Sequence, residues 1–145
     1  MSKLTGIEKD ASFTNLVKIG YQDLINAGDG GEIVIATIPA NGAVELVGVA
    51  KTEEIVGSST LFAEVGVDGT ADGLIAAFDV GAQTAPLFNT GGLFTTAGTS
   101  EAVSIVAAGA DPVDVILTIT DANIANLTAG EVTVGARVLD LGRFG

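Results

Sequence analysis

The chain contains no cysteine and no histidine. The absence of cysteine excludes a disulfide framework and thiolate chemistry. Without either residue, a Ser-His-Asp or Cys-His catalytic arrangement and a histidine-ligated metal site are also excluded. Two carboxylates could still form a glycosidase pair, but the chain has no tryptophan and a single tyrosine to line a sugar cleft. We therefore expect a protein that is not an enzyme.

Basic residues are also scarce. Lysine and arginine together number 6 against 18 acids, and the formal net charge is −12. Lys51 is the single base between residues 28 and 136. Binding to a phosphate backbone needs clustered lysine and arginine, and anionic membrane surfaces attract the same residues. We expect neither nucleic acid nor membrane as a partner.

Charged residues of either sign make up only 17% of the chain, whereas hydrophobic residues make up 48%. Large exposed apolar areas usually mark contacts with other molecules. We therefore expect other copies of the chain, or a partner, to cover part of the surface. The alternative interpretation is a chain that is rich in alanine and glycine and forms no such patch.

The stretch from residue 60 to residue 80 predicts a β-hairpin. Residues 60–67 alternate between two faces, which is typical of a strand with one face on a core. One face carries Leu61, Ala63, Val65 and Val67, and the other carries Phe62, Glu64 and Gly66. Residues 68–73 hold two glycines and two aspartates suited to a turn, and residues 74–80 begin the second strand.

The rest of the chain predicts further strands. Apolar or alternating runs lie at residues 33–38, 43–51, 101–107, 113–121 and 131–141. Asn41-Gly42 separates the first two runs and predicts a hairpin between them. No helical crossover separates the runs, so we expect an all-β fold. The prediction is a single domain over residues 28–145, with about eight antiparallel strands in a β-sandwich or jelly-roll-like arrangement.

Residues 1–27 predict an N-terminal arm that includes a short helix over residues 13–26. The apolar positions follow a helical stripe, with Gly28 as the stop signal. The stripe consists of Phe13, Leu16, Val17, Tyr21, Leu24 and Ile25. The alternative is an extended arm that runs over a neighbouring subunit.

We expect no cofactor, although one segment partly matches a calcium-binding loop and leaves calcium as the alternative. Asp68, Thr70, Asp72 and Gly73 fit positions 1, 3, 5 and 6 of such a loop, and Asp79 fits position 12, where glutamate is usual. The residues on either side of this segment predict strands rather than the helices that flank such a loop. Thr70 also stands where a carboxylate or amide ligand is usual. A solvated acidic turn is therefore the favoured interpretation.

Several large side chains are candidates for contacts between subunits. They are Phe13, Leu16, Tyr21, Phe88, Phe94, Arg137 and Arg143. The aromatic side chains fit a core or an interface better than a ligand platform, and the two arginines suit pairing with acids of a neighbouring subunit. A solvated position at the edge of a sheet is the alternative for both arginines.

Three stretches resemble small β-sandwich proteins from the structural gene clusters of tailed bacteriophages. They are GGEIVIATIPANGAVELVGV at 30–49, TLFAEVGVDGTADGLIAAF at 60–78 and LTAGEVTVGARVLDL at 127–141. The resemblance is to capsid decoration, or cement, proteins, which implies a jelly-roll or β-tulip-like fold and often a trimer. It implies a protein made in the host cytoplasm that sits on the outer capsid surface, binds the major capsid protein and stabilises the shell.

Two other classes of function stay open at this stage. One is another β-structural part of a virion, such as a head fibre, a tail-tube subunit or a baseplate subunit, which ring or tube formation by the pure protein would indicate. The other is a calcium- or carbohydrate-binding β module. A melting temperature that rises with calcium, and no longer does so after Asp68→Ala or Asp72→Ala, would indicate that module.

Overall fold

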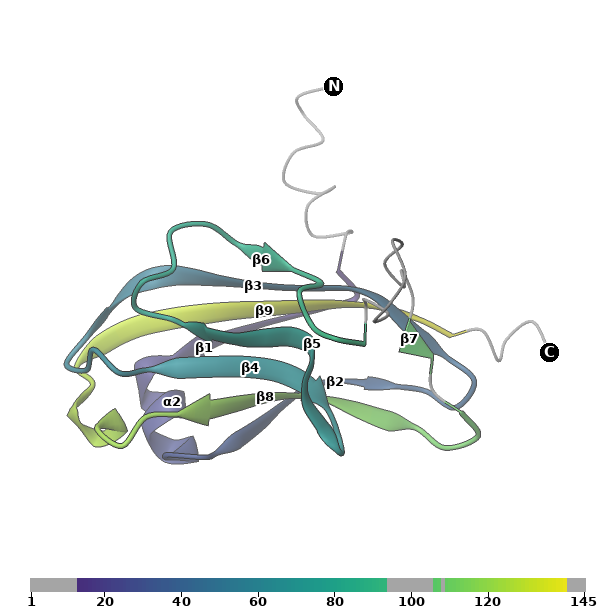
Figure 1. Ribbon diagram of the computed structural model, residues 1–145, viewed down its shortest axis with the longest axis horizontal. Helices are drawn as coiled ribbons and strands as arrows, with labels where there is room; N and C mark the ends of the chain where they lie inside the picture. Colours follow the sequence, from purple (N-terminus) through teal and green to yellow (C-terminus); the bar gives the residue numbers. More distant parts are fainter. Residues whose placement is uncertain (1–12, 94–105, 108, 141–145) are drawn as a thin grey trace, which may run out of the picture.

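Two antiparallel sheets lie face to face in the computed structural model, which describes residues 13–93, 106–107 and 109–140 (Figure 1). Sheet I has the strand order β1-β9-β3-β6, with the short β7 also paired to β3. Sheet II has the order β2-β8-β4-β5. The strands are β1 (Asn15–Gly20), β2 (Glu32–Ile38), β3 (Ala43–Val56), β4 (Phe62–Val67), β5 (Thr70–Asp79), β6 (Leu87–Phe88), β7 (Val106–Ala107), β8 (Val113–Thr120) and β9 (Ala129–Leu139). The predicted all-β sandwich is confirmed.

The strands pair in a nested order. β1 pairs with β9, β2 with β8, β3 with β6, and β4 with β5. Each of the first four strands is therefore matched with a strand from the second half of the chain, and successive pairs alternate between the two sheets. This connectivity is that of a jelly roll, which strand alternation alone does not distinguish from other sandwiches.

The core lies between the sheets and follows the period-2 alternation of the strands. Inward-facing side chains are almost fully buried, and each contributes about 1.5–3 kcal/mol of transfer free energy. They include Ile19, Ile35, Val47, Val65, Ile75, Leu117, Ile119 and Val134. The small helix α2 (Tyr21–Ala27) places Leu24 against the same core.

The hairpin predicted around residue 70 forms, with a shorter turn than expected. Only Asp68 and Gly69 connect β4 and β5, and Gly69 takes a positive φ of 84°. Gly66 allows a close approach, because a Cβ there would lie 2.0 Å from the carbonyl oxygen of Thr70. The glycine thus accommodates the irregular start of β5, where the register shifts between Val65 and Val67.

The helix predicted over residues 13–26 is wrong in its first half. Residues 15–20 form β1, whose residues pair one by one with β9, and the helix is confined to Tyr21–Ala27. Val17 and Ile19 are β-branched and suit a strand, and β9 offers an edge more than 110 residues away that no local pattern reveals. Gly28 ends the helix as expected. An arm stays a prediction for residues 1–12, which lie outside the described residues.

The hairpin predicted at Asn41-Gly42 is also wrong. The turn is present, with Asn41 at a φ of 60° and a hydrogen bond from Gly42 N–H to the Pro39 carbonyl. It carries the chain from sheet II to sheet I, however, so β2 and β3 do not pair.

Among the residues described, no helix is long and apolar enough to cross a membrane.

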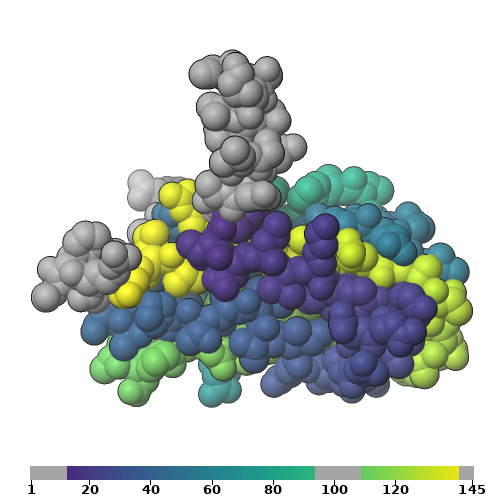
Figure 2. Space-filling model, turned by 180° about the vertical axis from the view of Figure 1, so that it is seen from behind, coloured from purple at the N-terminus to yellow at the C-terminus, as the bar shows by residue number. Residues whose placement is uncertain are grey.

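Edge strands of the two sheets lie side by side along one side of the sandwich (Figure 2). Figure 2 shows edge strand β1, in purple, beside edge strand β2, in blue, with α2 at one end. A hollow of about 380 Å³ lies there, lined in part by Val17, Lys18, Asp23 and Glu32. Both edge strands carry charged side chains, and β2 has an irregular register after Val34. Such features typically prevent an exposed edge strand from forming a β-sheet with another molecule.

Candidate functional site

Four strands of sheet I bring four residues into one row across the sheet. Leu16 of β1 lies opposite Gly135 of β9, Gly135 opposite Gly48 of β3, and Gly48 opposite Phe88 of β6. Their neighbours along β3 and β9, such as Val47 and Val134, are fully buried. Because side chains alternate along a strand, the row faces away from the core.

The two glycines of this row lie beneath aromatic rings. A Cβ on Gly135 would be 2.6 Å from Cδ1 of Phe13, and one on Gly48 would be 2.7 Å from Cε1 of Phe88. An aromatic ring over a glycine covers backbone that would otherwise be exposed. The absence of side chains at the glycines is thus what lets both rings lie close against the sheet.

These residues form an apolar patch on the outer face of sheet I. We define the patch as Phe13, Leu16, Gly48, Pro86, Phe88 and Gly135, which line a shallow hollow of about 180 Å³. Leu16 is 47% exposed and Phe88 is 51% exposed. Large side chains that remain this open to water usually mark a contact surface when they are grouped.

Asn89 holds the β6 side of the patch in place. Its side chain accepts a hydrogen bond from Val47 N–H at 2.8 Å and donates one to the Glu45 carbonyl at 3.1 Å. Its own N–H donates to the Val47 carbonyl at 3.1 Å. Asn89 also has a positive φ of 50°, a conformation that asparagine tolerates better than most residues. Phe88 is therefore presented by a fixed turn.

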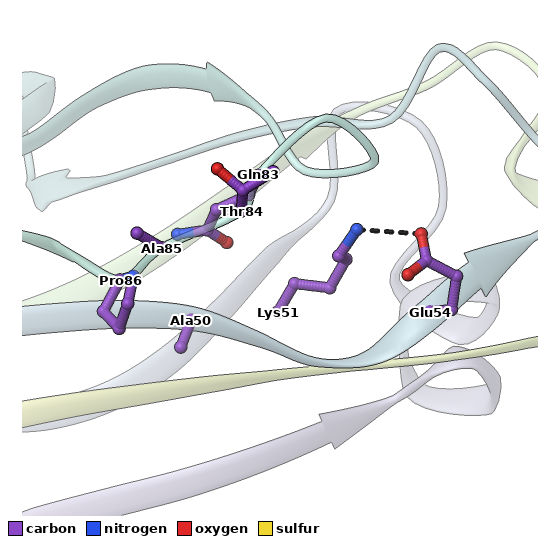
Figure 3. A pocket seen from close by; sticks show the side chains of 7 residues that line it. All are labelled: Ala50, Lys51, Glu54, Gln83, Thr84, Ala85 and Pro86. Atoms are coloured by element: carbon purple, nitrogen blue, oxygen red, sulfur yellow. Dashed lines mark hydrogen bonds and ion pairs between the residues drawn. The ribbon is translucent and has the colours of Figure 1, made fainter.

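A polar pocket of about 380 Å³ adjoins the patch and shares Pro86 with it, and Ala50 lines both this pocket and the shallow hollow of the patch. Figure 3 shows Lys51 and Glu54 on one side of this pocket, with the segment from Gln83 to Pro86 facing them. The Lys51 ammonium donates to Glu54 Oε1 at 2.8 Å and to the Gly81 carbonyl at 2.9 Å. The lysine thus holds the loop after β5 against β3.

The two sheets differ in charge. Sheet I strands carry the bases Lys18, Lys51 and Arg137 with the acids Glu45, Glu53, Glu54 and Glu131. Sheet II strands carry the acids Glu32, Glu64, Asp72, Asp79 and Asp114, and no base. The apolar patch therefore lies on the sheet whose charges nearly balance.

The structure groups some of the predicted interface residues and separates others. Phe13, Leu16 and Phe88 meet in the patch. Arg137 lies on the same sheet and forms an ion pair with Glu45 of its own chain at 2.8 Å. Tyr21 instead packs against the core from α2. Phe94 and Arg143 lie outside the described residues.

The sequence interpretation missed Gly48, Pro86 and Gly135 as parts of the patch. A glycine inside a strand often marks a site where other groups approach the backbone closely, and Gly48 and Gly135 each interrupt an alternating run. That signal was available, but the cross-strand register that sets the two glycines opposite each other was not.

The three acids proposed for calcium are spread along the hairpin. Asp68 lies in the turn, Asp72 near the start of β5 and Asp79 at its end, where Oδ1 accepts a hydrogen bond from Ala82 N–H at 3.3 Å. A strand rises about 3.3 Å per residue, so β5 carries Asp72 and Asp79 far apart. Within the described ranges, no three acids are grouped as metal ligands. Calcium binding stays a prediction.

Asp121 is the one buried charged residue among those described, and it ties loops together at one end of the sandwich. Its Oδ1 accepts hydrogen bonds from Thr60 Oγ1 at 2.7 Å and Asn123 N–H at 2.9 Å. Its own N–H donates to Asp29 Oδ1 at 2.9 Å. Burial raises the pKa of Asp121, but hydrogen bonds from the Ser58 and Thr60 side chains and the Asn123 backbone outweigh burial and lower it overall.

The chain shares its fold with chains of two phage capsid structures. A chain of the cyanophage Pam1 capsid asymmetric unit aligns with a TM-score of 0.60 and 15% identity, covering 86% of this chain and 81% of the other. A chain of the acidic stable capsid structure of Helicobacter pylori bacteriophage KHP30 aligns with a TM-score of 0.50 and 16% identity, covering 86% and 91%. No family model and no curated protein matches the sequence.

Proposed function

We propose that the protein is a structural, non-enzymatic component of a bacteriophage virion, which decorates the outer surface of the capsid and stabilises it by binding the coat lattice and itself. The fold shared with chains of two phage capsids over most of the chain supports a virion role. The apolar patch carries the binding part of the proposal, because its exposed leucine and phenylalanine need a partner to cover them.

The patch has the features of an energetically important contact. Aromatic side chains at the centre of an interface often contribute more than 2 kcal/mol each, and surrounding residues mainly exclude water. Phe88 is aromatic and exposed, and Asn89 fixes the turn that carries it, so little backbone freedom is lost when it is covered. In the virion we expect Phe88 to be fully buried.

Sedimentation of the purified protein with empty shells of the virus that encodes it tests this proposal. We expect saturable co-sedimentation and a higher melting temperature of the decorated shells. Phe88→Ser should weaken binding to shells about 30-fold, which corresponds to a loss of about 2 kcal/mol, because copies that no longer bind each other attach to the lattice singly.

Phe62→Ser is the matched control, because Phe62 is 43% exposed on sheet II and lies outside the patch. It should bind shells as the unchanged protein does. A protein that does not co-sediment with shells at any ratio would contradict decoration. The trimer expected from the family resemblance stays a prediction that the mass of the pure protein decides.

A further inference from the structure

We infer that the apolar patch seats a second copy of this chain, so that sheet I of one copy lies face to face on sheet I of its partner. The inference deepens the self-binding part of the proposed function and names the surface and symmetry of that contact. It also differs from the trimer, because the features described below favour a two-fold axis.

Charge restricts which faces two copies can share. Each chain carries a net charge of −12, so most pairs of surfaces repel. The outer face of sheet II brings Glu32 and Glu64 to the two sides of Thr118 without any base. On sheet I, Lys18 and Arg137 offset two of the three acids Glu45, Glu53 and Glu131, so two such faces repel each other less than two faces of sheet II.

The shape of the patch favours two-fold symmetry. The shallow hollow and the exposed side chains Leu16 and Phe88 lie on the same face. An exposed side chain of one copy can therefore enter the hollow of the other copy, and the reverse contact forms at the same time. A surface that pairs with itself forms an isologous contact about a two-fold axis. A ring of three would instead need a protruding group and its receiving hollow on separate faces.

The cross-strand row predicts which residues meet. A two-fold axis parallel to the strands, through the middle of the row, sets Leu16 of one copy opposite Phe88 of the other. It also sets the Gly48–Gly135 pair of one copy over that of the other. Face-to-face sheets pack about 10 Å apart, and the glycines leave room for the rings between them.

A charge exchange tests this pairing. Within one chain, the backbones of Leu16 and Phe88 are three strand spacings apart, about 14 Å, whereas the proposed pairing sets each residue directly opposite the other residue of the partner. Leu16→Lys alone and Phe88→Glu alone should each weaken self-association about 100-fold. The double variant should recover most of the association, because each lysine then lies opposite a glutamate of the partner.

The measurement is the mass of the full-length protein by sedimentation equilibrium over about 1 μM to 100 μM. Phe62→Glu, on sheet II, is the control and should associate as the unchanged protein does. A mass of two copies, lost in the single variants and recovered in the double variant, is the expected result. The recovery shows that the single variants still fold.

Three results would overturn the inference: a mass of three copies, association that survives Phe88→Glu, or an unchanged protein that stays monomeric. If that monomer binds shells and Phe88→Ser does not, the shell covers the patch, and decoration of the capsid stands without self-binding. If pairs form as expected but no shell is bound, the inference stands and the proposed function fails.

Discussion

At the scale of single residues, Asp121 links the fold to pH. Its carboxylate is buried and accepts hydrogen bonds, and its pKa in the folded protein lies below the unfolded value of about 3.9. A group whose pKa is lowered by folding adds stability above its unfolded pKa. That stability is lost as pH falls through the folded pKa.

We therefore expect the free energy of unfolding to fall when pH drops below about 4, and Asp121→Asn to reduce this fall. At pH 7 the variant should also be about 1–3 kcal/mol less stable, because an amide cannot replace an ionised acceptor. Urea unfolding between pH 2.5 and pH 7 measures both effects, in steps of about half a unit across the range near 4. Asp111→Asn, at an exposed position, serves as the control and should keep the original pH dependence.

The patch shows which features of a contact surface the sequence alone can predict. Phe13, Leu16 and Phe88 were recognisable in the sequence as large side chains suited to an interface. Their grouping was not, because it depends on which residue of β9 lies opposite which residue of β1 and β3. Gly48 and Gly135 complete the patch, and although each is visible in the sequence as a glycine within a strand, only the register sets them opposite each other.

At the scale of elements, strand alternation in the sequence predicted most of sheet II and the core. β4, β8 and β9 show it clearly, because each has one face on the core and one face toward solvent. β1 was missed because its apolar spacing also fits a helix. A six-residue segment adopts a strand when a distant edge supplies hydrogen bonds, and that edge is not a local property.

The two faces of β1 make a test of this correction. Ile19 is 2% exposed and points to the core, whereas Leu16 is 47% exposed and points outward. Ile19→Ala should lower the free energy of unfolding by about 2–4 kcal/mol, and Leu16→Ala by less than about 1 kcal/mol in the isolated chain. Urea unfolding of dilute protein measures the difference.

The result would differ if residues 15–20 belonged to a detached N-terminal arm. Both substitutions would then leave the unfolding midpoint unchanged, because neither side chain would contribute to the cooperative unit. Equal large losses would contradict the strand in another way, since a strand of a sandwich buries only one of its two faces.

At the scale of the whole molecule, the excess of acidic residues makes stability and self-association depend on salt concentration. With a net charge of −12 the folded chain repels itself, and salt screens this repulsion. Raising the ionic strength from about 10 mM to 150 mM shortens the screening length from about 30 Å to 8 Å. We expect both the melting temperature and the self-association to rise over this range.

Calcium chloride at the same ionic strength as sodium chloride is the control. If screening alone acts, the two salts raise the melting temperature by similar amounts. A larger rise in calcium that Asp68→Ala or Asp72→Ala removes would identify a specific calcium site in the hairpin. A melting temperature that falls with added salt would contradict the self-repulsion argument.

The nested strand order also governs how the chain acquires its fold during synthesis. Among the described strands, β1 is synthesised before the others but pairs with β9, which is synthesised after them, and β2 likewise waits for β8. Within the part of the chain that the structure describes, only the β4–β5 hairpin pairs two consecutive strands, so it can close early. We therefore expect folding to proceed outward from the middle, and premature termination before β9 to leave β1 without its partner strand.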